Sequence, residues 1–173
     1  LREGSSTEHE VVAAHAAALG AESVGVRVDV GAGPNLEARA RDARYGALEA
    51  AARQRGASRV LVGHTADDQA ETVLLALLRG SAAAGLAGMA VRRGAIVRPL
   101  LEIRRAETEA LCADLGLEPL HDPSNDDRSF RRAWIRHAVL PLLAEGAGRD
   151  LVPVLTRQAE VLRTETEYLD ALA

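Results

Sequence analysis

Lysine is absent from this chain of 173 residues, and its 21 basic residues are all arginine. No residue here can therefore form a Schiff base or act as the lysine of a Walker-type phosphate loop. Cys112 is the only cysteine, so an internal disulfide is excluded, which is typical of a reducing compartment. Aromatic residues make up only 2% of the sequence, so the core must be built from leucine, valine and alanine, which favours helices.

No long apolar run and no signal peptide are visible. The longest uncharged apolar stretch, residues 80–91, is rich in glycine and alanine and too short to span a bilayer. The net charge of −4 argues against binding nucleic acid by bulk charge, although a local patch could still do so. We therefore predict a soluble, cytoplasmic protein that does not contact a membrane.

Hydrophobic periodicity predicts alternating helices and strands. Helices are expected over residues 6–18, 35–55, 66–79, 104–115, 128–144 and 151–172, strands over residues 23–30, 59–62 and 95–100, and a glycine-rich loop over residues 81–90. This alternation indicates an α/β fold with a Rossmann-like parallel sheet. Three strands are few for such a sheet, so we expect more of it before residue 1. We divide the chain into an α/β domain, residues 1–127, and a helical extension, residues 128–173.

The polar stretch 63–72 lies between a predicted strand and a predicted helix. Thr65 and Asp68 are spaced as a capping box, so part of its acidity is explained by helix-start chemistry. His64, Asp67, Asp68 and Gln69 nevertheless follow the carboxyl end of a strand, where open α/β sheets bind ligands. Because hard carboxylates suit Mg²⁺, this stretch predicts a site for a phosphorylated ligand with a metal.

A second cluster lies on the helix that begins near residue 128. Arg128, Arg132 and Arg136 recur every four residues and form one guanidinium face, which favours phosphate binding. The alternative is a solvated face paired with Asp126 and Asp127. We interpret Trp134 on the same helix as a packing residue rather than a platform for a base.

A third cluster, Arg41, Arg44 and Tyr45, lies near the middle of the helix predicted over residues 35–55. By itself this cluster is as well explained by an exposed, charged helix face.

Six phrases in this order resemble the tRNA(Ile)-lysidine synthetases of the PP-loop (N-type ATP-pyrophosphatase) superfamily. They are NLEARAR to RY (residues 35–45), GHTADDQAET (63–72), LRGS to GLAGM (78–89), RPLL (98–101), DPSN (122–125) and IRH (135–137). The resemblance extends from residue 1 to about residue 145, and it strengthens the functional interpretation of all three clusters.

The resemblance implies an adenine nucleotide alpha hydrolase-like fold and an enzyme that uses ATP and Mg²⁺. Such an enzyme joins free L-lysine to C2 of the wobble cytidine of tRNA(Ile) with the CAU anticodon, through an adenylated base. Residue by residue, the resemblance implies catalytic roles for His64, Asp68, Arg44 and Arg136. It also implies nucleotide binding by Gly63, His64 and Arg132, and a metal near Asp67. A homodimer is left open. The alternatives are another PP-loop tRNA-modifying enzyme, such as a thiolating one, and a non-catalytic tRNA-binding scaffold.

The chain also departs from the family. The phosphate loop Ser-Gly-Gly-x-Asp-Ser is absent and is expected upstream of Leu1, and Ala133 replaces an asparagine that the family often has. The family's carboxyl-terminal tRNA-reading domains are not recognised either. We therefore expect these 173 residues alone to be inactive or nearly so.

Overall fold

The computed structural model describes residues 5–31, 33–34, 36–120 and 122–172. The chain forms two compact units, Leu1–Val60 and Leu61–Ala173. The predicted division at residues 127 and 128 stays a prediction. Among the described residues, none of the helices has the length and apolar character needed to cross a membrane.

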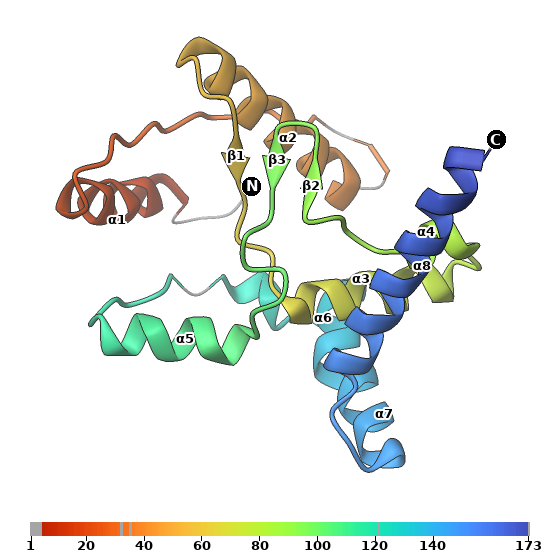
Figure 1. The fold of residues 1–173 in the computed structure, drawn as a ribbon. Helices are drawn as coiled ribbons and strands as arrows, with labels where there is room; N and C mark the ends of the chain where they lie inside the picture. The colour runs from red at the N-terminus through yellow and green to blue at the C-terminus, as the bar shows by residue number, and fades with distance from the viewer. Residues whose placement is uncertain (1–4, 32, 35, 121, 173) are drawn as a thin grey trace. The chain divides into compact units, whose positions relative to one another are not determined.

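The first unit contains two helices, α1 (Ser5–Ala18) and α2 (Leu36–Gln54) (Figure 1). Both helices were predicted, although Asn35, where the second was expected to begin, lies outside the described residues. The strand predicted over residues 23–30 is wrong, because residues 21–30 form no regular secondary structure. Val24, Val26 and Val28 alternate as in a strand but are 47%, 55% and 39% exposed. A strand needs a neighbour for its N–H and C=O groups, and the described residues offer none here.

The second unit is richer in helices. Its elements are β1 (Val60–Leu61), whose second residue opens the unit, α3 (Ala66–Leu78), α4 (Ala83–Leu86), β2 (Arg92–Arg93), β3 (Ile96–Val97), α5 (Arg105–Asp114), the 3₁₀ turn η1 (Pro123–Asn125), α6 (Arg131–Trp134), the π-helix η2 (Ile135–Val139), α7 (Leu140–Ala147) and α8 (Val152–Leu172). The helices were predicted, apart from the short α4 in the expected loop and the π segment. The helix expected from residue 128 begins at Arg131.

The sheet is small and has the order β1-β3-β2. Strands β2 and β3 are antiparallel, with Arg92 opposite Val97 and Arg93 opposite Ile96. Gly94, with φ +58°, supplies the left-handed residue of the tight turn between them. The α/β class holds, but the predicted Rossmann-like parallel sheet is not shown. The predicted strands 59–62 and 95–100 are present as the shorter neighbours β1 and β3, joined by a long segment that contains α3, and β2 adds an antiparallel hairpin that was not predicted.

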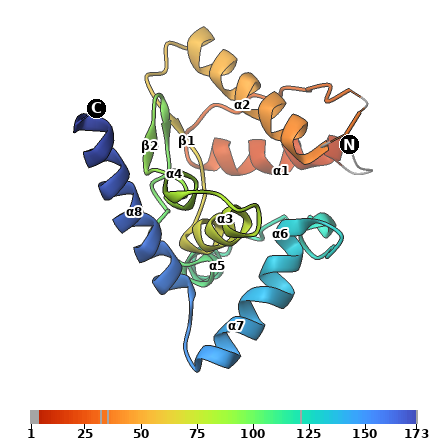
Figure 2. The ribbon, with the colours of Figure 1, turned by 90° about the vertical axis from the view of Figure 1, so that its right-hand side faces the viewer.

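Helix α3 is the centre of the second unit and packs against α8, as both views of the ribbon show (Figures 1 and 2). One core cluster joins Ala66 and Ala70 of α3 to Val152 of α8. A second joins Leu74 and Leu75 of α3 to Ile135 of the π-helix, which is fully buried. The buried face of α3 therefore fixes the positions of the elements on either side of it.

Gln69 anchors α3 to the segment after α4. Its Nε2 donates to the carbonyl oxygen of Met89 at 2.9 Å, and its Oε1 accepts from the Met89 N–H at 2.8 Å. Gly88 has φ +62°, and a Cβ there would lie 2.8 Å from Oε1 of Gln69. Arg163 of α8 donates to the carbonyl oxygens of Ala87 and Met89 at 2.9 and 2.8 Å. Gln69, a candidate ligand-site residue by sequence, thus holds the scaffold together.

Candidate functional site

The amino end of α3 carries the predicted capping box. Thr65 is the N-cap, and its side chain accepts from the Asp68 N–H at 3.5 Å. In return, Oδ2 of Asp68 accepts from the Thr65 N–H at 2.9 Å. This prediction is confirmed, and it leaves Oδ1 of Asp68 to face other partners.

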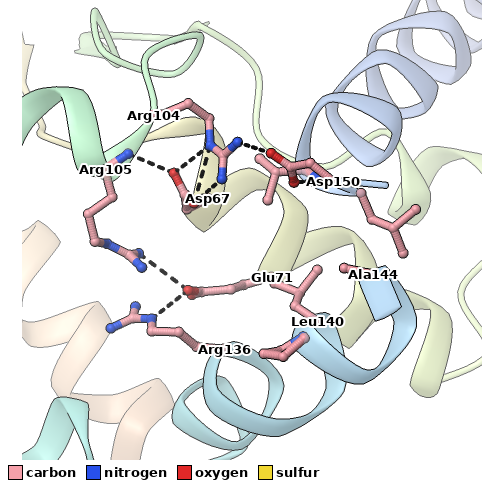
Figure 3. Close-up of a pocket in the computed structure, with 11 residues that line it drawn as sticks. Asp67, Glu71, Arg104, Arg105, Arg136, Leu140, Ala144 and Asp150 are labelled. Atoms are coloured by element: carbon pink, nitrogen blue, oxygen red, sulfur yellow. Dashed lines mark hydrogen bonds and ion pairs between the residues drawn. The ribbon is translucent and has the colours of Figure 1, made fainter. Parts of the chain in front are cut away.

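Asp67, one residue earlier, is held by the start of α5 (Figure 3). Arg104 donates from Nη2 to Oδ1 at 3.0 Å and from Nε to Oδ2 at 3.2 Å. The N–H of Arg105 donates to Oδ2 at 2.7 Å, as expected for a carboxylate at a helix amino end. Arg104 also pairs with Asp150, which precedes α8. Both oxygens of Asp67 are therefore engaged.

Glu71 lies one turn further along α3 and is fully buried. Its Oε1 accepts from Nε of Arg136 at 2.7 Å and from Nη2 of Arg105 at 3.3 Å. Its Oε2 is buried too, and no described residue donates a hydrogen bond to it. Arg105 also reaches Oδ1 of Asp68, at 3.2 Å. Three acids of α3 thus interleave with three arginines from α5 and the π-helix.

The charges in this network shift one another's titration. Burial would raise the pKa of Asp67, but the hydrogen bonds from Arg104 and Arg105 and their positive charges hold it below 3.8, its ordinary value. Burial likewise opposes the shift at Asp68, whose pKa is lowered by the Thr65 hydrogen bonds and by the charges of Arg105 and Arg132. Burial would lower the pKa of Arg136, but Glu71 raises it. These directions keep Asp67, Asp68 and Arg136 charged at neutral pH.

The lowered pKa values predict an acid-sensitive stability. A carboxyl whose pKa is lower in the folded state contributes its full stabilisation above the unfolded-state pKa, about 4, and loses it as the pH falls through the folded-state value. We expect the free energy of unfolding, measured by urea denaturation, to fall steeply below about pH 4. Asp67→Asn should flatten this fall, whereas Asp170→Asn, at an exposed position of α8, should not. Identical acid profiles for the Asp67→Asn variant and the parent chain would contradict the assignment.

A pocket of about 240 Å³ opens beside this network (Figure 3). One wall is charged and the other is mostly apolar. The lining residues are Asp67, Glu71, Arg104, Arg105, Arg136 and Asp150 on the charged side, and Leu140, Pro141, Ala144, Leu151 and Val152 on the apolar side. The pocket therefore suits a small ligand that carries charged groups on an aliphatic body.

The structure brings some of the predicted site residues to the pocket and places others elsewhere. Asp67 and Arg136 line the pocket, and Asp68 contacts Arg105 from just outside it. Arg132 does not line the pocket; its Nη2 donates to the Thr72 hydroxyl at 2.8 Å, one turn along α3 from Asp68. Arg132 and Arg136 thus contact α3, rather than Asp126 and Asp127 as in the alternative interpretation.

The turn after β1 holds two further predicted residues. Gly63 is exposed and His64 is partly buried, and neither lines the pocket. Arg44 lies on α2, in the first unit, and is exposed. The roles of these residues stay predictions.

Sequence reasoning missed Glu71, Arg104 and Arg105 as site residues. Glu71 stands four residues after Asp67 on one helix face, which is the signal that could have found it. The two arginines stand 37 and 38 residues from Asp67, and only the fold reveals that contact.

The donor set at Asp67 does not fit the metal that was predicted there. Arg104 and Arg105 occupy both carboxylate oxygens. Nowhere in the part of the chain that the structure describes do three or more His, Cys, Asp or Glu side chains gather as metal ligands. Mg²⁺ stays a prediction.

Comparison with known proteins places these features in a family. The family model of the PP-loop domain matches residues 1–143. Curated relatives named tRNA(Ile)-lysidine synthase match all of this chain: 47% identity to that of Leifsonia xyli subsp. xyli (52% of its length covered), 49% to that of Nocardia farcinica (54%) and 50% to that of Mycolicibacterium paratuberculosis (53%). The chain thus spans about half the length of these relatives.

A solved structure shares the fold. The U34-tRNA thiolase NcsA from Methanococcus maripaludis, with its [4Fe-4S] cluster, superposes with a TM-score of 0.70 over 94% of this chain and 59% of that one. At 18% identity, this likeness bears on the fold alone. The family model covers most of the sequence, and the curated relatives confirm the resemblance found in the motifs. The chain therefore belongs to the PP-loop domain family.

Proposed function

We propose that this chain is the ATP-using catalytic part of a tRNA(Ile)-lysidine synthetase. The reaction joins free L-lysine to C2 of the wobble cytidine in tRNA(Ile) with the CAU anticodon. The observation that carries the proposal is the near 50% identity, along the whole chain, to curated relatives of that name. We place the reaction in the cytoplasm, and a homodimer stays a prediction.

The pocket beside α3 supports a zwitterionic amino acid as one substrate. An amino acid brings a carboxylate and an ammonium group, and lysine adds an aliphatic stem. Both Glu71 and Arg136 line the pocket, so the Glu71 carboxylate can pair with an ammonium group and Arg136 can donate to a carboxylate. Leu140 and Val152 offer an apolar wall for the stem. We assign the lysine substrate to this pocket, with its ε-amine directed away from the charged wall.

The turn after β1 is the second part of the proposed site, where the nucleotide would bind. We propose that Gly63, His64 and Arg132 contact ATP, and that His64 and Asp68 orient the nucleotide and the reacting base or amine. The base O2 attacks the α-phosphate and pyrophosphate leaves; the lysine ε-amine then attacks C2 and AMP leaves. Both steps build charge on phosphate or base, which a cation such as Arg136 would stabilise, and the same role for Arg44 stays a prediction from the sequence.

The thiolating alternative has less support. The [4Fe-4S] cluster belongs to the structural neighbour, and such clusters are held mainly by cysteine thiolates. Cys112 is the only cysteine in these 173 residues, so they cannot supply such a set. A tRNA-binding scaffold would have no need of a buried Glu71 with an unused oxygen beside paired arginines.

The decisive experiment uses the complete encoded polypeptide that contains residues 1–173. We expect AMP release that depends on both L-lysine and tRNA(Ile) with the CAU anticodon. Methionine tRNA, which shares this anticodon, should give none. Sulfur incorporation into tRNA would favour the thiolating enzyme, and tight tRNA binding without AMP release would favour the scaffold; either result would overturn the proposal.

A further inference from the structure

A second hollow, of about 270 Å³, lies on α6 and the loop before it. We call it the Trp134 hollow, and it is lined by Arg128, Ser129, Arg131 and Trp134. Trp134 is 39% exposed, so part of the residue that we interpreted as a packing residue is open to solvent. An exposed indole between two arginines is unusual in a chain so poor in aromatic residues.

The charge of the Trp134 hollow is uncompensated. Arg128 and Arg131 are exposed, and neither forms an ion pair or side-chain hydrogen bond with a described residue. No acidic residue lines the hollow. Asp127, next in sequence, accepts from the Ser129 N–H at 2.9 Å and so is turned into the loop. Two guanidinium groups are therefore available to an anion.

These groups match one kind of ligand. Guanidinium groups bind phosphate oxygens, and an indole face stacks on a nucleobase. In a duplex the base faces are covered by neighbouring base pairs, so only an unpaired nucleotide offers one. We propose that the Trp134 hollow binds an unpaired nucleotide of an RNA loop, with its base on Trp134 and its phosphate on Arg128 and Arg131. The choice of RNA rests on the proposed function.

The position of the hollow fits a role in presenting the substrate. Trp134 and Arg136 are two residues apart, so they point to different sides of the helix. Arg136 faces Glu71 in the lysine pocket, while Trp134 faces outward. An RNA loop held at the Trp134 hollow would therefore be fixed to the same short helical segment that carries Arg136.

The chain offers a direct test, because Trp134 is its only tryptophan. Its fluorescence should be quenched when a stem-loop RNA with the anticodon-loop sequence is added to the 173-residue chain. A blunt duplex of the same composition should quench far less. The same comparison by anisotropy of labelled RNA, with the complete encoded polypeptide, provides a second measurement.

Variants separate the stacking contact from the phosphate contacts. Trp134→Ala should weaken loop binding by about 5- to 100-fold, and Trp134→Phe by less, because a phenyl ring keeps a π-face. Arg128→Ala and Arg131→Ala should each reduce the slope of log affinity against log salt by about 0.7. Arg157→Ala, which removes one exposed arginine from α8, is the matched control and should leave binding within about 2-fold.

Several results would overturn the proposal. Equal quenching by the duplex would exclude stacking, and equal quenching by an acidic peptide would indicate a protein partner. Unchanged RNA affinity in Trp134→Ala, with lysine-dependent AMP release intact, would refute the hollow while the proposed function stands. Normal quenching by the RNA loop without lysine-dependent AMP release would refute the proposed function and leave the hollow.

Discussion

Glu71→Ala is expected to lower the free energy of unfolding by about 3 kcal/mol, the largest loss we predict for a single side chain. The carboxylate is fully buried, and its removal leaves Asp68 as the acid that Arg105 and Arg136 still share, at 3.2 and 3.9 Å. Isolated loss of one partner of a buried ion pair costs about 3–5 kcal/mol. The two guanidinium side chains here are 27% and 23% exposed, so water relieves part of that cost.

Urea denaturation followed by circular dichroism measures this loss. Glu160→Ala, at an exposed position of α8, is the matched control and should change stability by no more than about 0.5 kcal/mol. Glu71→Gln keeps the shape but not the charge, so its loss should lie between those of the other two variants. A Glu71→Ala chain as stable as the control would show that the two arginines do not depend on this carboxylate.

Arg136→Ala is expected to lower kcat/KM for lysine by about 100- to 1,000-fold in the complete encoded polypeptide, if the proposed function holds. Arg136 lines the pocket and donates from Nε to Oε1 of Glu71. Its loss removes a cation that would meet the substrate and releases the neighbouring carboxylate. Arg136→Lys should recover only part of the activity, because an ammonium group cannot donate in the planar pattern of a guanidinium group.

Lysine-dependent AMP release measures this effect, with Arg157→Ala as the control for loss of an arginine. Because Arg136 also contributes to stability, the assay is made at a temperature where urea denaturation shows each variant folded. A folded Arg136→Ala enzyme within about 3-fold of the parent would remove Arg136 from the reacting groups.

The sequence predicted the helices well, because the signals for a helix are local. The Thr65–Asp68 capping box and the apolar period of α3 lie within a few residues of each other, and the structure confirms both. The strand predictions were only partly right, because β1 and β3 fall within the predicted strands 59–62 and 95–100, whereas the strand over residues 23–30 is absent. Alternation at Val24, Val26 and Val28 predicted a strand, but a strand also requires a neighbour that no local pattern reveals.

The candidate site divides in the same way. Asp67, Asp68 and Arg136 could be picked out because they stand in recognisable motifs, and the structure brings all three to one network. Arg104 could not, since its contact with Asp67 joins two elements that are distant in sequence. Gln69 stands in the same motif as the acids, yet it bonds to the Met89 main chain. Membership in a motif therefore did not distinguish a ligand-binding side chain from a structural one.

The π-helix changes the helical periodicity between α6 and α7. The N–H of Leu140 bonds to the carbonyl oxygen of Ile135, five residues earlier, so one extra residue is accommodated in that turn. In a regular α-helix, side chains five residues apart would diverge by about 140°, whereas here Ile135 and Leu140 both pack into the core. The extra residue shifts the side chains of α7 around the helix axis relative to Arg132, which precedes the π turn. The inserted residue thus lets Ile135 and Leu140 share one core while Arg136, within the same turn, keeps its contact with Glu71.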